Sequence, residues 1–510
     1  MMNDSPLRNN KLRLTIIIFS LITLFVRIYL IDFYKSNSGG VDQNIIYGLQ
    51  RILEGQPLYQ NPEAPPFAIM QYTPLFYHLT AWAGSLAGIG AEDVHQVYML
   101  SKTAALVCNL LTVLIVALTL KLFLRKRSDA LLFSLPAFMI LTVHYYLRVD
   151  SLQLLLFAAG IYATLRYLRS TNALWLMIAA LITALCILSK QNGVLLPLLI
   201  SGYLALVKGK WGAAIGFGLA SLAFFGGILH WIIGGDWMSF YQNAYLGLKN
   251  GFDYLFPVTI FTSQFFFDLI PWYFLCFIAV AKFIRRPELP VAQHFILFSA
   301  IASFFFAVIT GLKIGSANNY FTEFLVLMIL FLPYLLSHPL SQHQLFRIGR
   351  KQVTLKGYAI FCLVVLLASK TVGLFSSVFI ERWFKEEQHL YQSATELKNK
   401  LEQKGIPQEG EWIYFSRRHF LDNVFFDRTL FPNKDLINIV EEYNPGVYDF
   451  SRFTDSMNLG LVSYIITDTE KPGINEQYEY IPFIQFDSTR FDLIDTLGGY
   501  RIYKFSGRQQ

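Results

Sequence analysis

Two consecutive stretches near the start of the chain decide its fold. The first, Leu12 to Ile31, reads LRLTIIIFSLITLFVRIYLI, and the second, Ser38 to Tyr59, reads SGGVDQNIIYGLQRILEGQPLY. An apolar run of about 20 residues is long enough to cross a bilayer. The second stretch continues after Asp42 with apolar residues at helical spacing, which predicts a short amphipathic helix. Asp42 is therefore expected at the lipid–water boundary, held there by a surface helix.

The composition indicates a polytopic membrane protein. The chain has 510 residues, of which 54% are hydrophobic and 15% charged, and its mean hydropathy is +0.42. Soluble proteins carry about 25% charged residues. The net charge of +7 is carried by residues in short loops, which is typical of membrane topology rather than of a nucleic-acid-binding face. The four cysteines fall inside apolar segments and show neither a disulfide framework nor metal spacing.

Eleven apolar runs are predicted to span the membrane. The first lacks a small-residue cleavage site and is expected to stay as an anchor. The predicted spans are 12–31, 98–123, 130–146, 152–168, 173–188, 194–207, 213–233, 265–280, 292–309, 320–336 and 358–378. This is an all-α architecture, with the number of spans predicted to within one or two.

The basic loops decide the topology. The apolar piece from Tyr72 to Leu86 contains Pro74 and His78, and we interpret it as an interfacial helix rather than a span. Counting it as a span would place the basic loops at 125–127 and 285–286 outside, against the positive-inside rule. With eleven spans the N-terminus is cytoplasmic, and the long first loop, 32–97, lies outside together with the tail.

The tail differs in character from the rest of the chain. From residue 381 onward the charge density rises, and strand-like runs at 411–415, 461–467 and 500–505 alternate with helical patterns such as 392–404. We therefore predict a membrane domain, residues 1–380, followed by an extracytoplasmic α/β domain, residues 381–510.

Polar residues gather in the outer turns and loops. Charges near hydrocarbon are costly unless they are paired or face water, so several at one depth suggest a shared polar cavity. The span interiors carry almost no charge, which argues against an ion pathway. The residues are Asp42 and Tyr72 in the first loop, Arg148 and Asp150 in the second outer turn, Lys190 and Gln191 in the third, and Lys313, Asn319, Tyr320 and Glu323 before the tenth span.

Four of these residues also have a purely structural interpretation. Asp42 precedes a helical pattern and could serve as a helix N-cap. Arg148 and Asp150 could form a structural ion pair at a turn, and Lys190 could extend its ammonium to the interface from an apolar segment.

A cavity of this kind suits chemistry on a lipid-borne substrate. A carboxylate can act as general base toward an acceptor hydroxyl, and Lys or Arg can neutralise a departing phosphate. Nucleotide sugars are normally absent outside the cytosol, so a lipid phosphate is the natural carrier there. The chain contains no G-x-x-x-x-G-K-[ST] motif for ATP.

Five motifs in this order resemble a known superfamily. They are Asp42 with Tyr47, Arg51-Ile-Leu-Glu-Gly and Pro57-Leu-Tyr; Tyr72-Thr-Pro-Leu-Phe-Tyr; Arg148-Val-Asp150; Lys190-Gln191; and Lys313-x-Gly-Ser-x-x-Asn319-Tyr320-Phe-x-Glu323. Over residues 12–340 the chain resembles the integral-membrane glycosyltransferases of the GT-C fold, in the bacterial branch related to protein O-mannosyltransferases and the lipid A aminoarabinose transferase.

The resemblance implies roles for these residues. Asp42 and Asp150 would be the catalytic acidic positions, and Lys190, Arg148 and Gln191 would bind the phosphate of a polyprenyl-phosphate sugar donor. The remaining candidates, Tyr72, Lys313, Asn319, Tyr320 and Glu323, would form the sugar or acceptor pocket. Many relatives carry an acidic pair at the first motif, whereas Gln43 follows Asp42 here.

The resemblance further implies a bacterial inner-membrane enzyme with a periplasmic tail. Its acceptor would be a lipid, a glycan or a protein, and nucleic acid is not expected as a partner. No cofactor and no metal ligand set is indicated, and dependence on a divalent cation stays open. The alternative function is a transporter or flippase of lipid-linked sugars, which would show discontinuous helices and polar residues near the bilayer midplane.

Overall fold

The computed structural model describes residues 10–33, 41–140, 148–255, 269–286, 288–316, 318–349, 351–375, 383–415, 419–432, 434–468 and 488–507. Its contacts divide the chain into two compact units. The helical unit comprises Met1–Ile31, Lys102–Leu229 and Phe252–Glu381. The loop–tail unit comprises Asp32–Ser101, His230–Gly251 and Arg382–Gln510.

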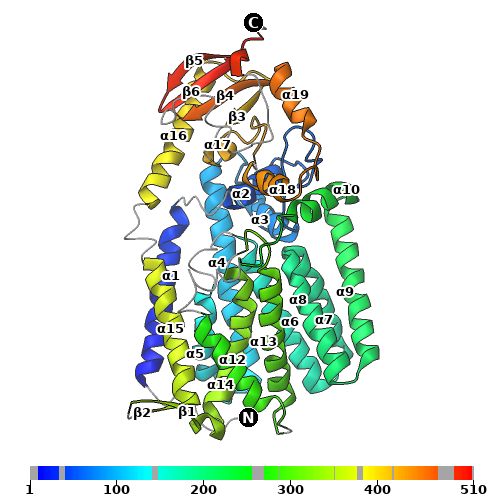
Figure 1. Cartoon of the computed structure of the whole chain (residues 1–510), viewed down its shortest axis with the longest axis vertical. Coiled ribbons are helices and arrows are strands. Elements are labelled where there is room, and N and C mark those ends of the chain that lie inside the picture. The colour runs from blue at the N-terminus through cyan, green and yellow to red at the C-terminus, as the bar shows by residue number, and fades with distance from the viewer. Residues whose placement is uncertain are drawn as a thin grey trace. The chain divides into compact units, whose positions relative to one another are not determined.

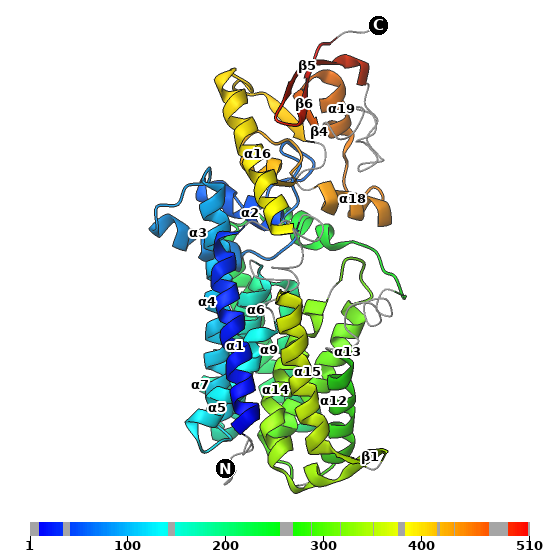
Figure 2. The same cartoon turned by 90° about the vertical axis from the view of Figure 1, so that its left-hand side faces the viewer.

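The helical unit is built from long apolar helices that run roughly parallel or antiparallel to one another (Figures 1 and 2). Those falling wholly or mostly in this unit are α1 (Asn10–Tyr29), α4 (Val94–Lys121), α5 (Arg127–Met139), α6 (Asp150–Ser170), α7 (Ala173–Ser189), α8 (Leu195–Gly202), α9 (Trp211–Ile232), α12 (Ile270–Phe283), α13 (Val291–Thr310), α14 (Thr322–Ser337) and α15 (Leu355–Phe375). The 3-10 helix η3 (Gln191–Val194) and the π-helix η4 (Tyr203–Val207) flank α8.

The membrane character and helical positions are confirmed. Each predicted span overlaps one of these helices, and parts of the third, eighth and eleventh predicted spans lie outside the described residues. Among the described residues, seven helices are long and apolar enough to cross a membrane, and three more apolar segments are shorter. The total of eleven spans stays a prediction.

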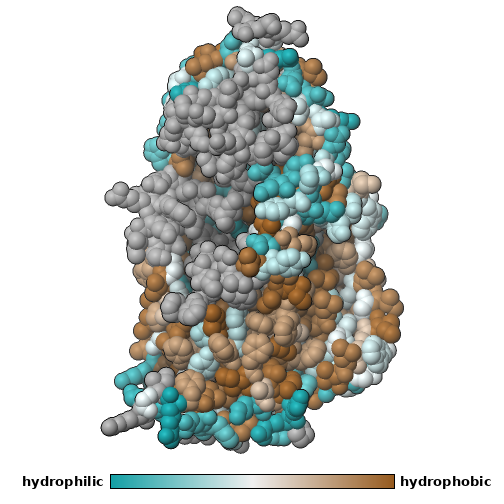
Figure 3. All heavy atoms as spheres, viewed as in Figure 1, coloured by the Kyte–Doolittle hydropathy of each residue, from teal (hydrophilic) through white to brown (hydrophobic). Residues whose placement is uncertain are grey.

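The surface of the helical unit fits a lipid environment. In the face shown in Figure 3 the helices are largely hydrophobic, and a hydrophilic rim lies at the end that carries the hairpin β1 (Gln344–Ile348) and β2 (Lys351–Thr354). Arg347 and Lys351 of this hairpin are exposed. Exposed basic residues at one end of an apolar bundle are the pattern that the positive-inside rule describes.

The loop–tail unit combines the first loop with the tail. Its helices and strands are α2 (Val41–Leu53), α3 (Leu75–Leu86), α10 (Trp237–Phe240), the π-helix η5 (Tyr241–Tyr245), η6 (Leu246–Leu248), α16 (Trp383–Gln403), β3 (Trp412–Phe415), α17 (His419–Val424), α18 (Lys434–Tyr443), α19 (Ser451–Leu459), β4 (Val462–Asp468), β5 (Phe491–Leu497) and β6 (Tyr500–Phe505). The predicted helix after Asp42 is confirmed as α2, and the apolar piece from Tyr72 to Leu86 contains helix α3; the interfacial position of α3 stays a prediction.

The tail contains one mixed sheet in the order β3-β4-β6-β5. Strands β3 and β4 are parallel, and the other neighbours are antiparallel. Helices α16 and α19 lie on opposite sides of the sheet in both views (Figures 1 and 2). Three strands fall where the sequence predicts them, whereas β5 was missed. Its register shifts between Leu493 and Asp495, and such a bulge breaks the alternation that identifies a strand.

Short polar bonds hold the irregular parts of this unit together. The Asn243 side chain accepts from Met70 N (2.8 Å) and donates to Gln60 O (2.7 Å). The Gln71 side chain donates to Gly247 O, and Phe67 N donates to Leu430 O. Buried main-chain groups need such partners because an unsatisfied one costs about 1–3 kcal/mol. The segment 239–250 is thereby attached to the first loop.

Candidate functional site

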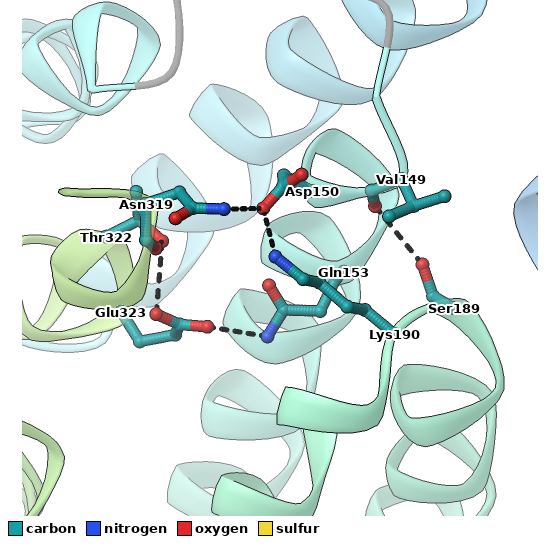
Figure 4. Close-up of polar contacts among 8 residues, drawn as sticks. All are labelled: Val149, Asp150, Gln153, Ser189, Lys190, Asn319, Thr322 and Glu323. Atoms are coloured by element: carbon teal, nitrogen blue, oxygen red, sulfur yellow. Dashed lines mark hydrogen bonds and ion pairs between the residues drawn. The ribbon is translucent and has the colours of Figure 1, made fainter. Parts of the chain in front are cut away.

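A cluster of buried polar side chains forms where α6 begins, α7 ends and α14 begins (Figure 4). The Oδ1 atom of Asp150 accepts hydrogen bonds from Lys190 Nζ (2.6 Å) and from Asn319 Nδ2 (2.8 Å). All three side chains are buried. Charge-assisted bonds of this length are strong, and an ion pair this deep holds its two partners in one geometry. Three segments that are far apart in sequence therefore meet at one carboxylate.

The Lys190 backbone is fixed by a tight reversal of the chain. Helix α7 ends at Ser189, Lys190 is extended with φ −159° and ψ 141°, and η3 follows at once. The Gly193 N–H donates to Lys190 O (2.8 Å). A Cβ atom at Gly193 would lie 2.4 Å from Cys186 O, so only glycine permits this approach. The Ser189 hydroxyl also donates to Val149 O (3.3 Å), which joins the end of α7 to the residue before Asp150.

A second carboxylate continues the cluster. Glu323 Oε1 accepts from Gln153 Nε2 (2.6 Å), and Oε2 lies 3.0 Å from the Thr322 hydroxyl (Figure 4). The same hydroxyl lies 2.8 Å from Asn319 O. Gln153 was not predicted from the sequence. The available signal was its spacing: residues three apart share a helix face, so Gln153 follows Asp150 on the same side of α6.

Two buried acceptor atoms of the cluster are not used. Asp150 Oδ2 and Asn319 Oδ1 accept no hydrogen bond from the described residues. Leaving a buried acceptor unpaired costs about 1–3 kcal/mol. The other polar atoms of these two side chains, Asp150 Oδ1 and Asn319 Nδ2, are hydrogen-bonded to each other. Asp150 Oδ2 and Asn319 Oδ1 are therefore suited to accept hydrogen bonds from a ligand that carries hydroxyl or amino groups.

Lys313 supplies a second positive charge near Lys190. It follows α13 in a turn that pairs with Phe252, and its ammonium makes no ion pair with a described residue. Burial, and then the nearby charge of Lys190, lower the pKa of Lys313 to about 8. The Nζ atom of Lys190 also lies 5.4 Å from the centre of the Tyr320 ring. Lys190, Lys313 and the neighbouring Arg148 carry three formal positive charges against the two carboxyl groups of Asp150 and Glu323, which leaves a local excess of one positive charge.

Arg148 and Gln191 complete the predicted residues of this unit. Arg148 is buried beside the cluster and interacts electrostatically with the Asp150 carboxylate. Gln191 is the first residue of η3, directly after Lys190. The predicted residues Arg148, Asp150, Lys190, Gln191, Lys313, Asn319, Tyr320 and Glu323 thus all belong to the helical unit.

Asp42 and Tyr72 belong to the loop–tail unit. Asp42 is the second residue of α2 and is 5% exposed. It lies within the first helical turn, so it does not occupy the N-cap position, and a negative charge there interacts favourably with the helix dipole. Tyr72 is partly buried, and its main-chain oxygen accepts from the Tyr59 hydroxyl (2.7 Å).

No metal-binding group emerges from the described part of the chain. Within those residues, no three His, Cys, Asp or Glu side chains are grouped so that they could hold a metal ion.

No protein-family model matches the sequence. No curated protein matches it either. Among solved structures, ArnT from Cupriavidus metallidurans in the apo state matches with a TM-score of 0.61 and 12% identity, over 96% of this chain and 97% of that one.

Two further structures are more distant. The archaeal oligosaccharyltransferase AglB from Archaeoglobus fulgidus matches at 13% identity over 89% of this chain and 69% of its own, with a TM-score of 0.47. The arabinofuranosyltransferase AftD from mycobacteria matches at 14% identity and a TM-score of 0.49, and this chain spans 40% of its length. On the match to ArnT across nearly the whole of both chains, the protein has the GT-C fold of integral-membrane glycosyltransferases.

Proposed function

We propose that the protein is a membrane glycosyltransferase that moves a sugar from a polyprenyl-phosphate donor to an acceptor on the extracytoplasmic face. The observation that carries this proposal is the buried Lys190–Asp150–Asn319 cluster in a chain with the GT-C fold. Buried charges among apolar helices are expensive, and they are retained where a polar substrate is bound.

In this proposal the donor phosphate is bound by the excess of positive charge. Lys190, Lys313 and Arg148 provide that charge, and Gln191 adds a hydrogen-bond donor. Lys313 supports this role because its ammonium makes no ion pair with a described residue and already repels Lys190. A phosphate would relieve that repulsion, and the two lysines would stabilise the negative charge that develops as the phosphate departs.

The donor sugar is assigned to the unused acceptors. Asp150 Oδ2 and Asn319 Oδ1 would accept hydrogens from sugar hydroxyl or amino groups, while Tyr320 offers a ring face. Glu323 would support the sugar site indirectly, because its hydrogen bonds to Gln153 and Thr322 join helices α6 and α14. Tyr72 is proposed as a further contact to sugar or acceptor.

The transfer step needs one base and one leaving group. The acceptor hydroxyl oxygen forms a bond to the anomeric carbon of the sugar, and its proton passes to Asp42. The bond from that carbon to the phosphate oxygen breaks, and the electron pair leaves with the polyprenyl phosphate. Asp42 is buried at the positive end of α2, which supports this assignment. Burial shields the carboxylate from water, and the helix dipole favours its negative charge.

The tail, from residue 381 onward, is proposed to form the extracytoplasmic domain that helps to select the acceptor. The corresponding localisation is the inner membrane of a bacterium with the N-terminus in the cytoplasm. The exposed Arg347 and Lys351, at the hydrophilic end that carries β1 and β2, support this orientation.

The test uses the full-length protein in lipid nanodiscs with radiolabelled polyprenyl-phosphate sugars and a panel of lipid, glycan and protein acceptors. We expect the wild type to consume one donor and Asp42→Asn to lose on the order of 100- to 10,000-fold in turnover. Asp32→Asn, which alters an exposed acidic residue of the same loop, serves as the matched control. Equal turnover by folded Asp42→Asn would refute the base assignment. Translocation of lipid-linked sugars without turnover would instead identify a flippase.

A further inference from the structure

Asn423 of the tail is clamped to helix α2. Its side chain is fully buried, and Nδ2 donates to the main-chain oxygen of Gln43 (3.0 Å) and to Gln50 Oε1 (3.3 Å). In return, Gln50 Nε2 donates to Asn423 O (2.9 Å). These residues are 380 and 373 positions apart in sequence. All of them lie in the loop–tail unit, so the clamp is internal to one compact body.

The clamp extends to the end of the first loop. Gln50 Nε2 uses its second hydrogen for Ala91 O (2.9 Å), and the Tyr98 hydroxyl lies 3.4 Å from Asn423 Oδ1. The polar atoms of both amide side chains are therefore engaged. A fully satisfied buried network is rigid, because any movement leaves a donor or an acceptor unpaired. A half-buried network of this kind would tolerate movement, whereas Asn423 and Gln50 are both 0% exposed.

The point of attachment is next to Asp42. Gln43 is the following residue in the first turn of α2, where helices fray because the first amide groups lack intrahelical partners. A bond from outside the helix to the Gln43 carbonyl holds that turn in place. The direction of the Asp42 carboxylate depends on the same turn.

We propose that Asn423 is a positioning residue for Asp42, so that the tail supports the chemical step itself and not only the choice of acceptor. This proposal rests on the proposed function of Asp42 as general base. Loss of the clamp misaligns the base without touching the phosphate-binding lysines. It therefore lowers kcat and leaves KM for the donor unchanged.

The experiment compares Asn423→Ala with the control Thr429→Ala in the full-length protein in nanodiscs. Thr429 is equally buried, and its hydroxyl bonds to Asp422 Oδ1 (2.7 Å) within the tail without reaching α2. Competent molecules are counted by binding of a non-hydrolysable donor analogue. We expect Asn423→Ala to lose roughly 10- to 100-fold in kcat at unchanged KM. Thr429→Ala should keep kcat within about threefold of wild type. A larger loss of kcat in Asn423→Ala than in Thr429→Ala then reports misalignment of Asp42 rather than a general disturbance of the tail.

A double variant tests whether Asn423 acts through Asp42. In the Asp42→Asn background the base is already removed, so Asn423→Ala should lower the residual turnover by less than about threefold. The proposal would be overturned if Asn423→Ala lowered kcat by the same factor in the Asp42→Asn background as in the wild type. Equal kcat values for Asn423→Ala and Thr429→Ala would also overturn it. If Asn423→Ala does not fold, Gln50→Ala is measured in its place. We expect Gln50→Ala to lower kcat by a smaller factor, and an unchanged kcat in this variant would overturn the proposal. Wild-type turnover by Asp42→Asn would instead defeat the proposed base, which keeps the two failures distinct.

Discussion

The Nζ atom of Lys190 lies 2.6 Å from the Oδ1 atom of Asp150, and both side chains are more than nine-tenths buried. Breaking such a pair leaves one charge buried without its partner, which costs about 3–5 kcal/mol, whereas replacing both partners costs far less. Lys190→Ala is therefore expected to lower the melting temperature strongly. The double variant Lys190→Met/Asp150→Asn should recover most of that loss, because Asn at position 150 can still accept from Asn319.

Turnover separates this structural effect from function. The double variant is expected to be folded and yet inactive with every polyprenyl-phosphate sugar, since it lacks both the ammonium that we propose to bind the donor phosphate and the Asp150 carboxylate. Thermal unfolding in detergent, followed by turnover in nanodiscs, checks both statements. A wild-type melting temperature for Lys190→Ala would contradict the buried pair.

Glu323 offers a variant that should be tolerated. The single Thr322 hydroxyl hydrogen is shared between Asn319 O and Glu323 Oε2. In Glu323→Gln the new NH₂ group can donate to the Thr322 oxygen, while the amide oxygen keeps the bond from Gln153. We expect a change in unfolding free energy within about 1 kcal/mol. Glu323→Leu breaks both bonds and should lose about 1–3 kcal/mol, as measured by thermal or denaturant unfolding. Equal stabilities of the two variants would contradict the hydrogen-bonded role of Glu323.

The donor affinity is expected to depend on pH through Lys313. Its pKa is lowered to about 8, so the side chain is positive below that pH and neutral above it. If only the charged form binds phosphate, KM for the donor rises roughly tenfold between about pH 7 and pH 9. In Lys313→Arg the charge persists at all these pH values, and the profile should be flat. Parallel profiles for wild type and Lys313→Arg would remove Lys313 from phosphate binding.

The reversal at Gly193 should be intolerant of any side chain. In Gly193→Ala the added Cβ would meet Cys186 O at 2.4 Å, so η3 must shift and move Lys190 with it. We expect a loss of about 1–3 kcal/mol in stability and a raised KM for the donor. Gly212→Ala is the matched control, since nothing lies within 4 Å of its Cβ position. In helix α9 that change should raise stability by up to about 1 kcal/mol. Equal behaviour of the two variants would show that η3 can move freely.

Periodicity and charge predicted the helices well, because most of the apolar runs are long and basic residues mark their ends. They also predicted that Asp150, Lys190 and Asn319 lie close together, because turns predicted on the same side of a membrane share one depth. The hydrogen bonds of Asp150 to Lys190 and Asn319 agree with this prediction. Gln153 was missed because a single amide in an apolar helix does not stand out by composition, and its spacing of three from Asp150 was the only signal that it faces the cluster.

Long-range attachment had no local signal. The first loop and residues 230–251 belong with the tail through bonds such as Asn243 to Met70 and Asn423 to Gln43. A single buried asparagine in a tail helix looks like any other polar residue in sequence. Its partner is a main-chain oxygen, which every residue possesses. Only the three-dimensional structure identifies such pairs.

The bond between Asn423 and Gln43 also sets an order of events during synthesis. A chain grows at about 5–20 residues per second, so the 380 residues between the two partners take roughly 20–75 s to appear. Throughout that time α2 exists without its clamp, while the membrane helices are being inserted. The nascent protein thus carries helix α2 without its clamp until the residues around Asn423 emerge.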